Sequence, residues 1–223
     1  STVGNNQILI EDAESIKELD LSDPRGGSDI GDLDDLSGIE NFTNLKKLTC
    51  DRQSLRRVDL SKNTKLEYVW LANNKLIDIN LKNLEFLEEL QLIGNQLETI
   101  DLSDNPYLKI LRLGENNFSS FDLKSTPRVD YLVLKDNPLT EIKNLIDLDL
   151  LKSFFVESTN LSSLDVSSIT SLDYLDANDT PLLDCISVSQ SQLDNLVSSW
   201  LFDDGTEFSL DCNWVFIINN VIK

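Results

Sequence analysis

Carboxylates are the most abundant side chains in this sequence that can do chemistry. The 39 Asp and Glu residues include adjacent pairs such as Asp34-Asp35 and Asp203-Asp204, which offer the two acids that a glycoside hydrolase uses. Acidic neighbours are common in so acidic a chain, so we interpret both pairs as solvated surface. Further Asp residues recur at one place in successive segments, where we favour turn capping over binding of a hard cation. These are Asp59, Asp101, Asp122 and Asp165.

Other catalytic chemistry is poorly represented. The chain contains no histidine, which excludes mechanisms that use imidazole as a general base or as a metal ligand. No activated nucleophile, metal-ligand set or phosphate-binding loop stands out. We therefore predict that the protein is not an enzyme, with no catalytic residue, no metal site and no cofactor.

The overall charge excludes further classes of partner. Lys and Arg number 19 against the 39 acids, for a net charge of −20, whereas nucleic-acid binding requires a basic patch. No apolar run approaches the roughly 18 residues of a membrane span, so we expect no membrane insertion. Because Met is absent, we expect that a leader was removed or that the sequence starts inside a longer protein.

The element that must position any functional residue is a repeat. The pattern L-x-x-L-x-L-x-x-N-x-L recurs seven times at intervals of 21 or 22 residues. The modules start at Leu45, Leu66, Leu87, Leu108, Val129, Leu151 and Leu172.

The alternation inside each module predicts a short strand whose Leu side chains point inward. Stacked in parallel, these strands bury one continuous core. The amides of Asn74, Asn95, Asn116 and Asn137 then form a ladder between coils, in which Thr159 and Thr180 take part only partly. About 21 residues per coil leave room only for short extended or 3₁₀ segments on the opposite side.

The outward positions of the same strands carry apolar and aromatic side chains that folding does not need. Aromatic anchors with an Arg among them are typical of protein-binding surfaces, and flat rings also stack on sugars. The third alternative is structural, because aromatic neighbours can simply pack along the sheet. We predict a ligand-binding face that consists of Tyr68, Trp70, Ile93, Ile110, Arg112, Tyr131, Val133, Phe155 and Tyr174.

The repeats resemble the leucine-rich repeat family, in particular the short repeats of secreted and surface proteins of Bacteroidetes-type bacteria and those of internalins. The segment Asp32–Leu45 resembles the start of such arrays, and Cys50 lies where many of them have L-x-C. The resemblance implies an α/β-type repeat solenoid, a horseshoe with a parallel β-sheet on its concave face. We expect an N-terminal cap and degenerate first repeat at 1–44, the array at 45–182, and a C-terminal cap with an apolar tail at 183–223.

The same resemblance implies how the C-terminal cap is held. In bacterial arrays of this kind two cysteines flank a short Trp-bearing helix, which we place in 191–202 and which implies a disulfide between Cys185 and Cys212. A disulfide indicates an oxidising compartment, hence an extracellular or cell-surface protein. Cys50 is expected to be a buried, free thiol. We predict a monomeric recognition module for a protein or peptide, with a polysaccharide ligand or a structural spacer as alternatives.

Overall fold

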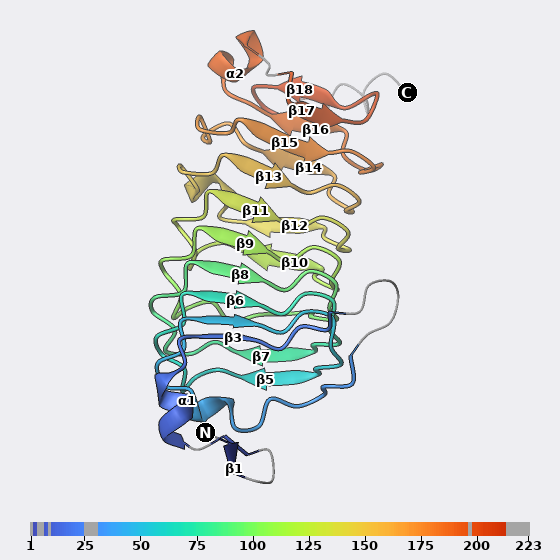
Figure 1. Cartoon of the computed structure of the whole chain (residues 1–223). Helices are drawn as coiled ribbons and strands as arrows, with labels where there is room; N and C mark the ends of the chain where they lie inside the picture. The colour runs from blue at the N-terminus through green and yellow to red at the C-terminus, as the bar shows by residue number, and fades with distance from the viewer. Residues whose placement is uncertain (1, 4–6, 9, 25–30, 196–197, 213–223) are drawn as a thin grey trace.

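The computed structural model describes residues 2–3, 7–8, 10–24, 31–195 and 198–212, and it is a solenoid of stacked coils (Figure 1). Each coil contributes one short strand to a parallel sheet of nine strands, which we call the main sheet. Equivalent residues of neighbouring coils pair directly, as Tyr68 does with Lys47 and Glu89. The strands in spatial order are β3 (Glu18–Asp20), β4 (Lys47–Thr49), β6 (Tyr68–Trp70), β8 (Glu89–Gln91), β9 (Ile110–Arg112), β11 (Tyr131–Val133), β13 (Ser153–Phe155), β15 (Tyr174–Ala177) and β17 (Trp200–Phe202).

The opposite side of the coils consists of shorter parallel sheets and turns, as predicted. The strands here are β5 (Arg57–Asp59) with β7 (Asp78–Asn80), β10 (Ser120–Asp122) with β12 (Glu141–Lys143), and β14 (Ser163–Asp165) with β16 (Cys185–Ser187) and β18 (Glu207–Ser209). Two 3₁₀ segments, η1 (Ile39–Asn41) and η2 (Leu145–Asp147), interrupt this side. The second lies in the module that starts at Val129, which is 22 residues long instead of 21.

The core lies between the two sides and is filled by the repeated apolar positions. The central residue of each main-sheet strand from β4 to β15 has no exposed surface: Leu48, Val69, Leu90, Leu111, Leu132, Phe154 and Leu175. The period-2 prediction for these strands is therefore confirmed. Because each coil covers the next, the core is continuous along the solenoid.

The predicted Asn ladder is also confirmed. Asn95 donates from Nδ2 to the carbonyls of Leu71 (3.0 Å) and Leu92 (2.9 Å), and its Oδ1 accepts from the backbone N–H of Leu76 (2.9 Å). Asn74, Asn116 and Asn137 repeat this pattern. Thr159 donates only one such bond, to Val156, so the ladder weakens toward the C-terminal coils.

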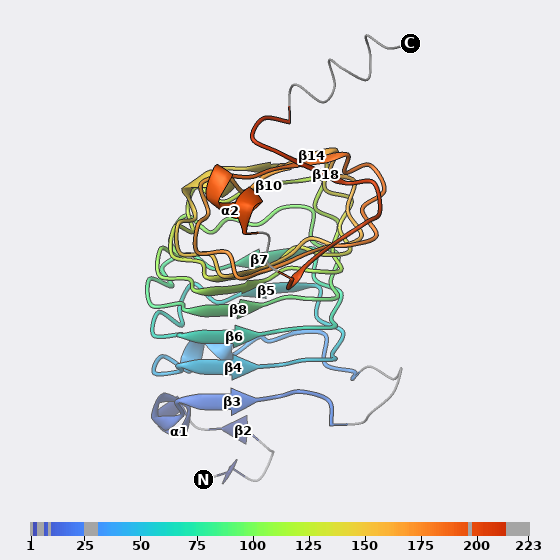
Figure 2. The ribbon, with the colours of Figure 1, turned by 90° about the horizontal axis from the view of Figure 1, so that it is seen from above.

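The two ends of the solenoid carry the irregular elements (Figure 2). At the N-terminal end are the antiparallel pair β1 (Thr2–Val3) and β2 (Gln7–Ile8) and the helix α1 (Ile10–Ser15). At the other end is α2 (Gln190–Asp194), which begins at a capping box of Ser189 and Gln192. The expected Trp-bearing helix is wrong in one respect: α2 ends before Trp200, which is a buried residue of β17. The apolar tail lies outside the described residues.

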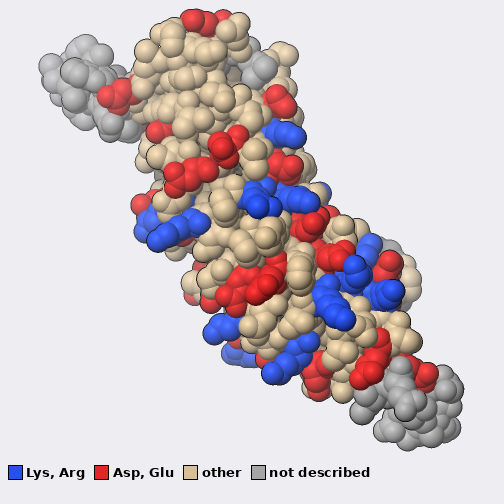
Figure 3. Space-filling view, turned by 90° about the vertical axis from the view of Figure 1, so that its left-hand side faces the viewer, with Lys and Arg blue, Asp and Glu red and all other residues tan. Residues whose placement is uncertain are grey.

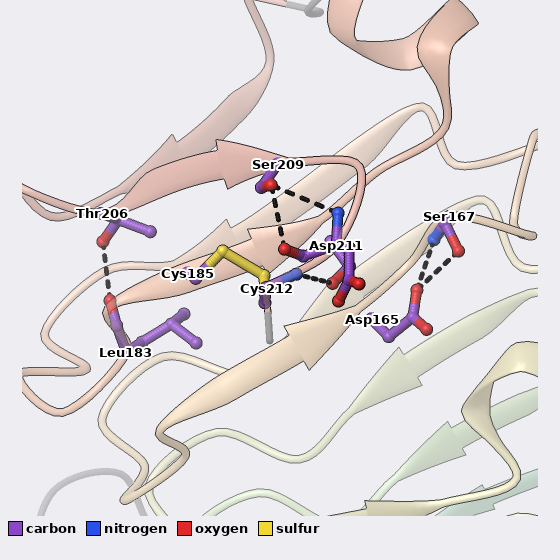
Figure 4. The surroundings of a disulfide bond; sticks show 9 residues. Asp165, Ser167, Leu183, Cys185, Thr206, Ser209, Asp211 and Cys212 are labelled. Atoms are coloured by element: carbon purple, nitrogen blue, oxygen red, sulfur yellow. Dashed lines mark hydrogen bonds between the residues drawn. A yellow bond between two sulfur atoms is a disulfide. The ribbon is translucent and has the colours of Figure 1, made fainter. Parts of the chain in front are cut away.

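The predicted disulfide between Cys185 and Cys212 closes the C-terminal end, with the two Cα atoms 5.7 Å apart (Figure 4). It joins the start of β16 to the segment that follows β18. Nearby, Thr206 donates to the carbonyl of Leu183 (3.1 Å), which ties the last coil to the one before it. Cys50 is free and buried, as expected.

Candidate binding face

The structure places the nine predicted residues at outward positions of the main sheet or directly beside it. Tyr68 and Trp70 belong to β6, and Ile93 follows β8. The remaining residues, Ile110, Arg112, Tyr131, Val133, Phe155 and Tyr174, lie on β9, β11, β13 and β15. Eight of the nine are half-buried, whereas Val133 is only 5% exposed. Val133 therefore packs among its neighbours and offers a partner little surface.

Three of these rings form a connected group, which we call the aromatic row: Tyr131, Phe155 and Tyr174. The ring centroids of Tyr131 and Phe155 lie 5.3 Å apart, and those of Phe155 and Tyr174 lie 5.0 Å apart. The contacts run diagonally, because Tyr131 pairs in register with Ser153 and Phe155 pairs with Asp176. Diagonal neighbours on one face of a sheet are within reach of aromatic side chains.

Arg112 extends the aromatic row toward the N-terminal coils. Its guanidinium carbon lies 4.8 Å from the centre of the Tyr131 ring, and its Nη1 forms an ion pair with Glu89 at 2.5 Å. Both partners of that ion pair are mostly covered, with 24% and 15% of their side chains exposed. The guanidinium is thus fixed by a charge on one side and a ring on the other.

The structure does not bring all predicted residues together. Trp70 lies apart from the aromatic row, under the ammonium group of Lys47 at 3.9 Å from the ring centre. Ile110 lies between Glu89 and Tyr131 in the register of the sheet, and so links the two parts of the face. The face therefore has two aromatic centres, one at β6 and one from β11 to β15.

Two carboxylates border the aromatic row toward the C-terminal ends of its strands. Asp176 pairs in register with Phe155 and accepts a hydrogen bond from the Tyr174 hydroxyl at 3.4 Å. Glu157 lies 3.8 Å from Lys135, and that ammonium group is shared with Glu115 and Asp136. Burial raises the pKa of Glu157, and the negative charge of Asp176 raises it further.

Most of the other acids considered from the sequence have structural roles, whereas Asp34 and Asp204 are exposed. Asp203 accepts the backbone N–H groups of Asp179 (2.9 Å) and Thr180 (2.8 Å), and Asp35 accepts bonds from Ser37. The repeated Asp residues opposite the main sheet cap turns as predicted: each accepts the N–H two residues ahead, at 2.9 to 3.0 Å for Asp59, Asp101, Asp122 and Asp165. In the described part of the chain, no group of three or more potential metal-ligating side chains is present.

The flank that carries the loops leading into the main sheet has a different character. Acidic and basic side chains alternate over it (Figure 3), and neighbouring coils pair them, as in Lys46 with Glu67 at 2.5 Å and Lys109 with Glu88 at 2.9 Å. Because both pairs are largely exposed, they contribute little to stability. No helix in the described residues is long and apolar enough to cross a membrane.

Sequence reasoning missed several residues that complete the face. Glu89 forms an ion pair with Arg112, and Lys47 lies over the ring of Trp70. The aromatic row is bordered by Asp176 and Glu157. It is extended by Leu201 of β17, which has 39% of its surface exposed. The same alternation that located the aromatics also puts Glu89 and Asp176 on outward positions. Leu201 gave no signal, because its segment was expected to be helical.

Comparisons with known proteins agree with this fold. No protein-family model matches the chain, and no curated protein does either. Among solved structures, the functional domain of InlJ from Listeria monocytogenes, which includes a cysteine ladder, matches with a TM-score of 0.73 and 24% identity over 90% of this chain and 41% of its own.

Two further internalins from the same organism match in the same way. Internalin InlF has a TM-score of 0.72 and 26% identity over 93% of this chain and 66% of its own, and internalin C2 has 0.67 and 20% over 91% and 84%. The chain thus spans less than two thirds of the length of the first two. Together with the coils of about 21 residues and the Asn ladder, these likenesses show that the chain has a leucine-rich repeat fold, similar to that of the internalins.

Proposed function

We propose that the main-sheet face is an extracellular recognition surface for a protein or peptide, with the aromatic row as its centre. The observation that carries the proposal is the row itself: three half-buried rings, in which Phe155 contacts both tyrosines, on positions that the core does not require. Large rings held rigid by their neighbours supply contact area at a low cost in side-chain entropy. Arg112, fixed by Glu89 and Tyr131, adds a charged donor at the edge of the row.

The geometry of the rings favours a protein ligand over a polysaccharide. Neighbouring rings of the row are tilted against each other by 41° and 35°, so they do not offer one flat platform to a chain of sugar rings. One solved structure of this fold is a plant peptide hormone receptor, RGFR1, in complex with RGF2, which matches with a TM-score of 0.64.

The disulfide supports an extracellular location, because such bonds persist in oxidising compartments. A purely structural spacer is the competing explanation for the aromatic row. It predicts that the rings stabilise the sheet and that their removal lowers the melting temperature, Tm, without affecting any binding.

The test is a random peptide library displayed on phage and a glycan array, each probed with the purified chain and with Phe155→Ala. Phe155 is chosen because its ring contacts both tyrosines of the row. Phe86→Ala is the matched control, since Phe86 is 58% exposed and lies outside the main-sheet strands. Tm of each variant is measured in parallel.

We expect peptides that bind the wild type and Phe86→Ala but bind Phe155→Ala at least tenfold more weakly, which corresponds to about 1.4 kcal/mol. The glycan array is expected to stay silent. If no peptide depends on Phe155 while Tm falls in that variant, the aromatic row is structural. Glycans that bind in a Phe155-dependent way would replace the peptide as the ligand class.

A further inference from the structure

The C-terminal part of the main-sheet face has an excess of negative charge next to its apolar rings. Asp176 lies directly across from Phe155 in the sheet register, and Glu157 lies two residues beyond Phe155, which is the last residue of β13. In the part of the chain that the structure describes, Asp176 forms no ion pair; its contacts are the Tyr174 hydroxyl and the N–H of Asn178. This charge therefore remains available to a ligand.

Glu157 is the less satisfied of the two carboxylates. Its side chain is 20% exposed, and Oε2 is buried without a hydrogen-bond partner. The Nζ of Lys135 lies 3.8 Å from Oε1 of Glu157, beyond hydrogen-bond distance. The same ammonium group lies 3.5 Å from a carboxylate oxygen of Asp136 and 3.9 Å from one of Glu115. One ammonium group thus faces three carboxylates and leaves them with a surplus of negative charge. A buried carboxylate oxygen that lacks a donor carries a desolvation penalty, so the charge of Glu157 is poorly compensated within the protein.

The apolar surface next to these carboxylates has the shape of a short strip. It runs from Tyr131 through Phe155 and Tyr174 to Leu201, which pairs in register with Asp176. A flat, delocalised cation is suited to such a place, because it stacks on rings and bonds carboxylates in its plane. The face already uses this combination once, where Arg112 lies between Glu89 and Tyr131.

We propose that Glu157, Asp176 and the rings of Phe155 and Tyr174 form a surface binding site for an arginine side chain of the bound peptide. The inference rests on the proposed function and narrows it to a partner segment in which an arginine is next to an apolar residue. The apolar residue contacts Leu201 and the rings, and the guanidinium pairs with the two carboxylates. Charge complementarity, rather than apolar area alone, then selects the partner.

The experiment extends the peptide selection with two variants of equal charge. The double variant Glu157→Gln/Asp176→Asn removes the two carboxylates with little change in shape. The control Glu85→Gln/Glu98→Gln removes the same number of charges from exposed residues outside the main-sheet strands. Phe155→Ala reports on the proposed function independently. The strongest peptide is also synthesised with citrulline in place of each arginine, which keeps the planar shape but removes the charge.

We expect the selected peptides to be enriched in arginine beside an apolar residue. The Glu157→Gln/Asp176→Asn variant and the citrulline peptide should each weaken binding by about tenfold, as expected for a partly covered charge pair. Their effects should not add, because both remove the same contact. The Glu85→Gln/Glu98→Gln control should bind like the wild type.

Two other outcomes are distinguishable. Peptides that depend on Phe155 but show no arginine preference, and that bind the Glu157→Gln/Asp176→Asn variant normally, would overturn the arginine site and leave the proposed function intact. A selection in which no peptide depends on Phe155 would overturn both.

Discussion

At the scale of single residues, stability depends on amides that connect one coil to the next. Asn95 donates two hydrogen bonds and accepts one, all to buried backbone groups at 2.9 to 3.0 Å. Its replacement leaves those groups without partners in the core, which costs more than the bonds themselves contribute.

We therefore predict that Asn95→Ala lowers the free energy of unfolding by about 3 kcal/mol. The control is Asn117→Ala, because Asn117 is exposed and, in the described structure, bonds only through its backbone N–H, to the carbonyl of Leu97. Urea unfolding followed by circular dichroism measures both. A loss of stability in Asn95→Ala no greater than in the control would show that water satisfies the ladder after mutation.

Cys50 is the residue on which burial has the clearest chemical consequence. Its side chain has no exposed surface, and burial raises the pKa of the thiol to about 12. At neutral pH the thiolate is therefore scarce and also inaccessible. Because Cys185 and Cys212 are joined, Cys50 accounts for the one free thiol of the three cysteines.

We predict that the native protein does not react with Ellman's reagent at neutral pH. Protein unfolded in guanidinium chloride without reductant should react with it and release one equivalent of thionitrobenzoate per chain. A fast reaction of the native protein would mean that the coil around Cys50 opens readily or that the thiol is reactive.

At the scale of elements, much of the structure was predictable because the repeat fixes both period and direction. In the pattern L-x-x-L-x-L, the last two Leu positions point inward and the residues beside them point outward. This alternation predicted β6, β9, β11 and their equivalents, and it predicted that the aromatic positions lie on the outside. The diagonal contacts of the aromatic row were not predictable, because they depend on side-chain rotamers and on the stagger between strands.

Two recurring features of the coils could not be predicted from the sequence, because the residue type at each position varies from coil to coil. One position in each coil from β4 to β15 has a left-handed backbone, with φ between 51° and 71°, yet it is occupied by Arg52, Asn73, Gly94, Glu115, Asp136, Ser158 and Asp179. A second amide column opposite the main sheet consists of Asn63 and Asn105. Gln192 of α2 makes equivalent bonds to Val166 and Ile169. The helix expected around Trp200 is wrong, because the spacing of apolar residues in this segment also fits a strand in which Trp200 points inward.

The C-terminal disulfide is expected to stabilise the last coil of the solenoid. It restrains the last coil, whose β18 pairs with β16. We predict that Cys185→Ala/Cys212→Ala loses about 3 kcal/mol of stability, the amount expected for a loop of this size. Hydrogen exchange should accelerate at the amides of Val188 and Glu207, which bond across the last coils, and stay unchanged at Leu134 in the middle of the array. An even acceleration throughout the array would mean that the solenoid unfolds as one cooperative unit.

At the scale of the whole molecule, the net charge of −20 and two sets of carboxylates determine how stability responds to pH. Burial raises the pKa of Glu157 and Asp51, so the folded state binds their protons more readily than the unfolded state and gains stability as the pH falls. Hydrogen bonds from Ser61, Ser103 and Lys124 lower the pKa of Asp59, Asp101 and Asp122. The stability from these turns is present above the ordinary pKa of 3.8 and is lost as the pH falls through the lowered values.

The two sets together predict that Tm rises as the pH is lowered from about 7.5 and falls again below the ordinary Asp pKa of 3.8, as the turn carboxylates become protonated. Self-repulsion adds to the rise, since protonation of acids reduces the net charge. About 1 M sodium chloride, which shortens the screening length to about 3 Å, should raise Tm at pH 7.5 more than at pH 5, because less repulsion remains at the lower pH. Glu157→Gln should reduce the rise at low salt and at high salt alike, because its share comes from burial, whereas repulsion is screened. A Tm that falls steadily from pH 7.5 to pH 5 would contradict the assignment of Glu157 and Asp51 as destabilising charges, and would mean that ion pairs such as that of Arg112 with Glu89 outweigh burial in this molecule.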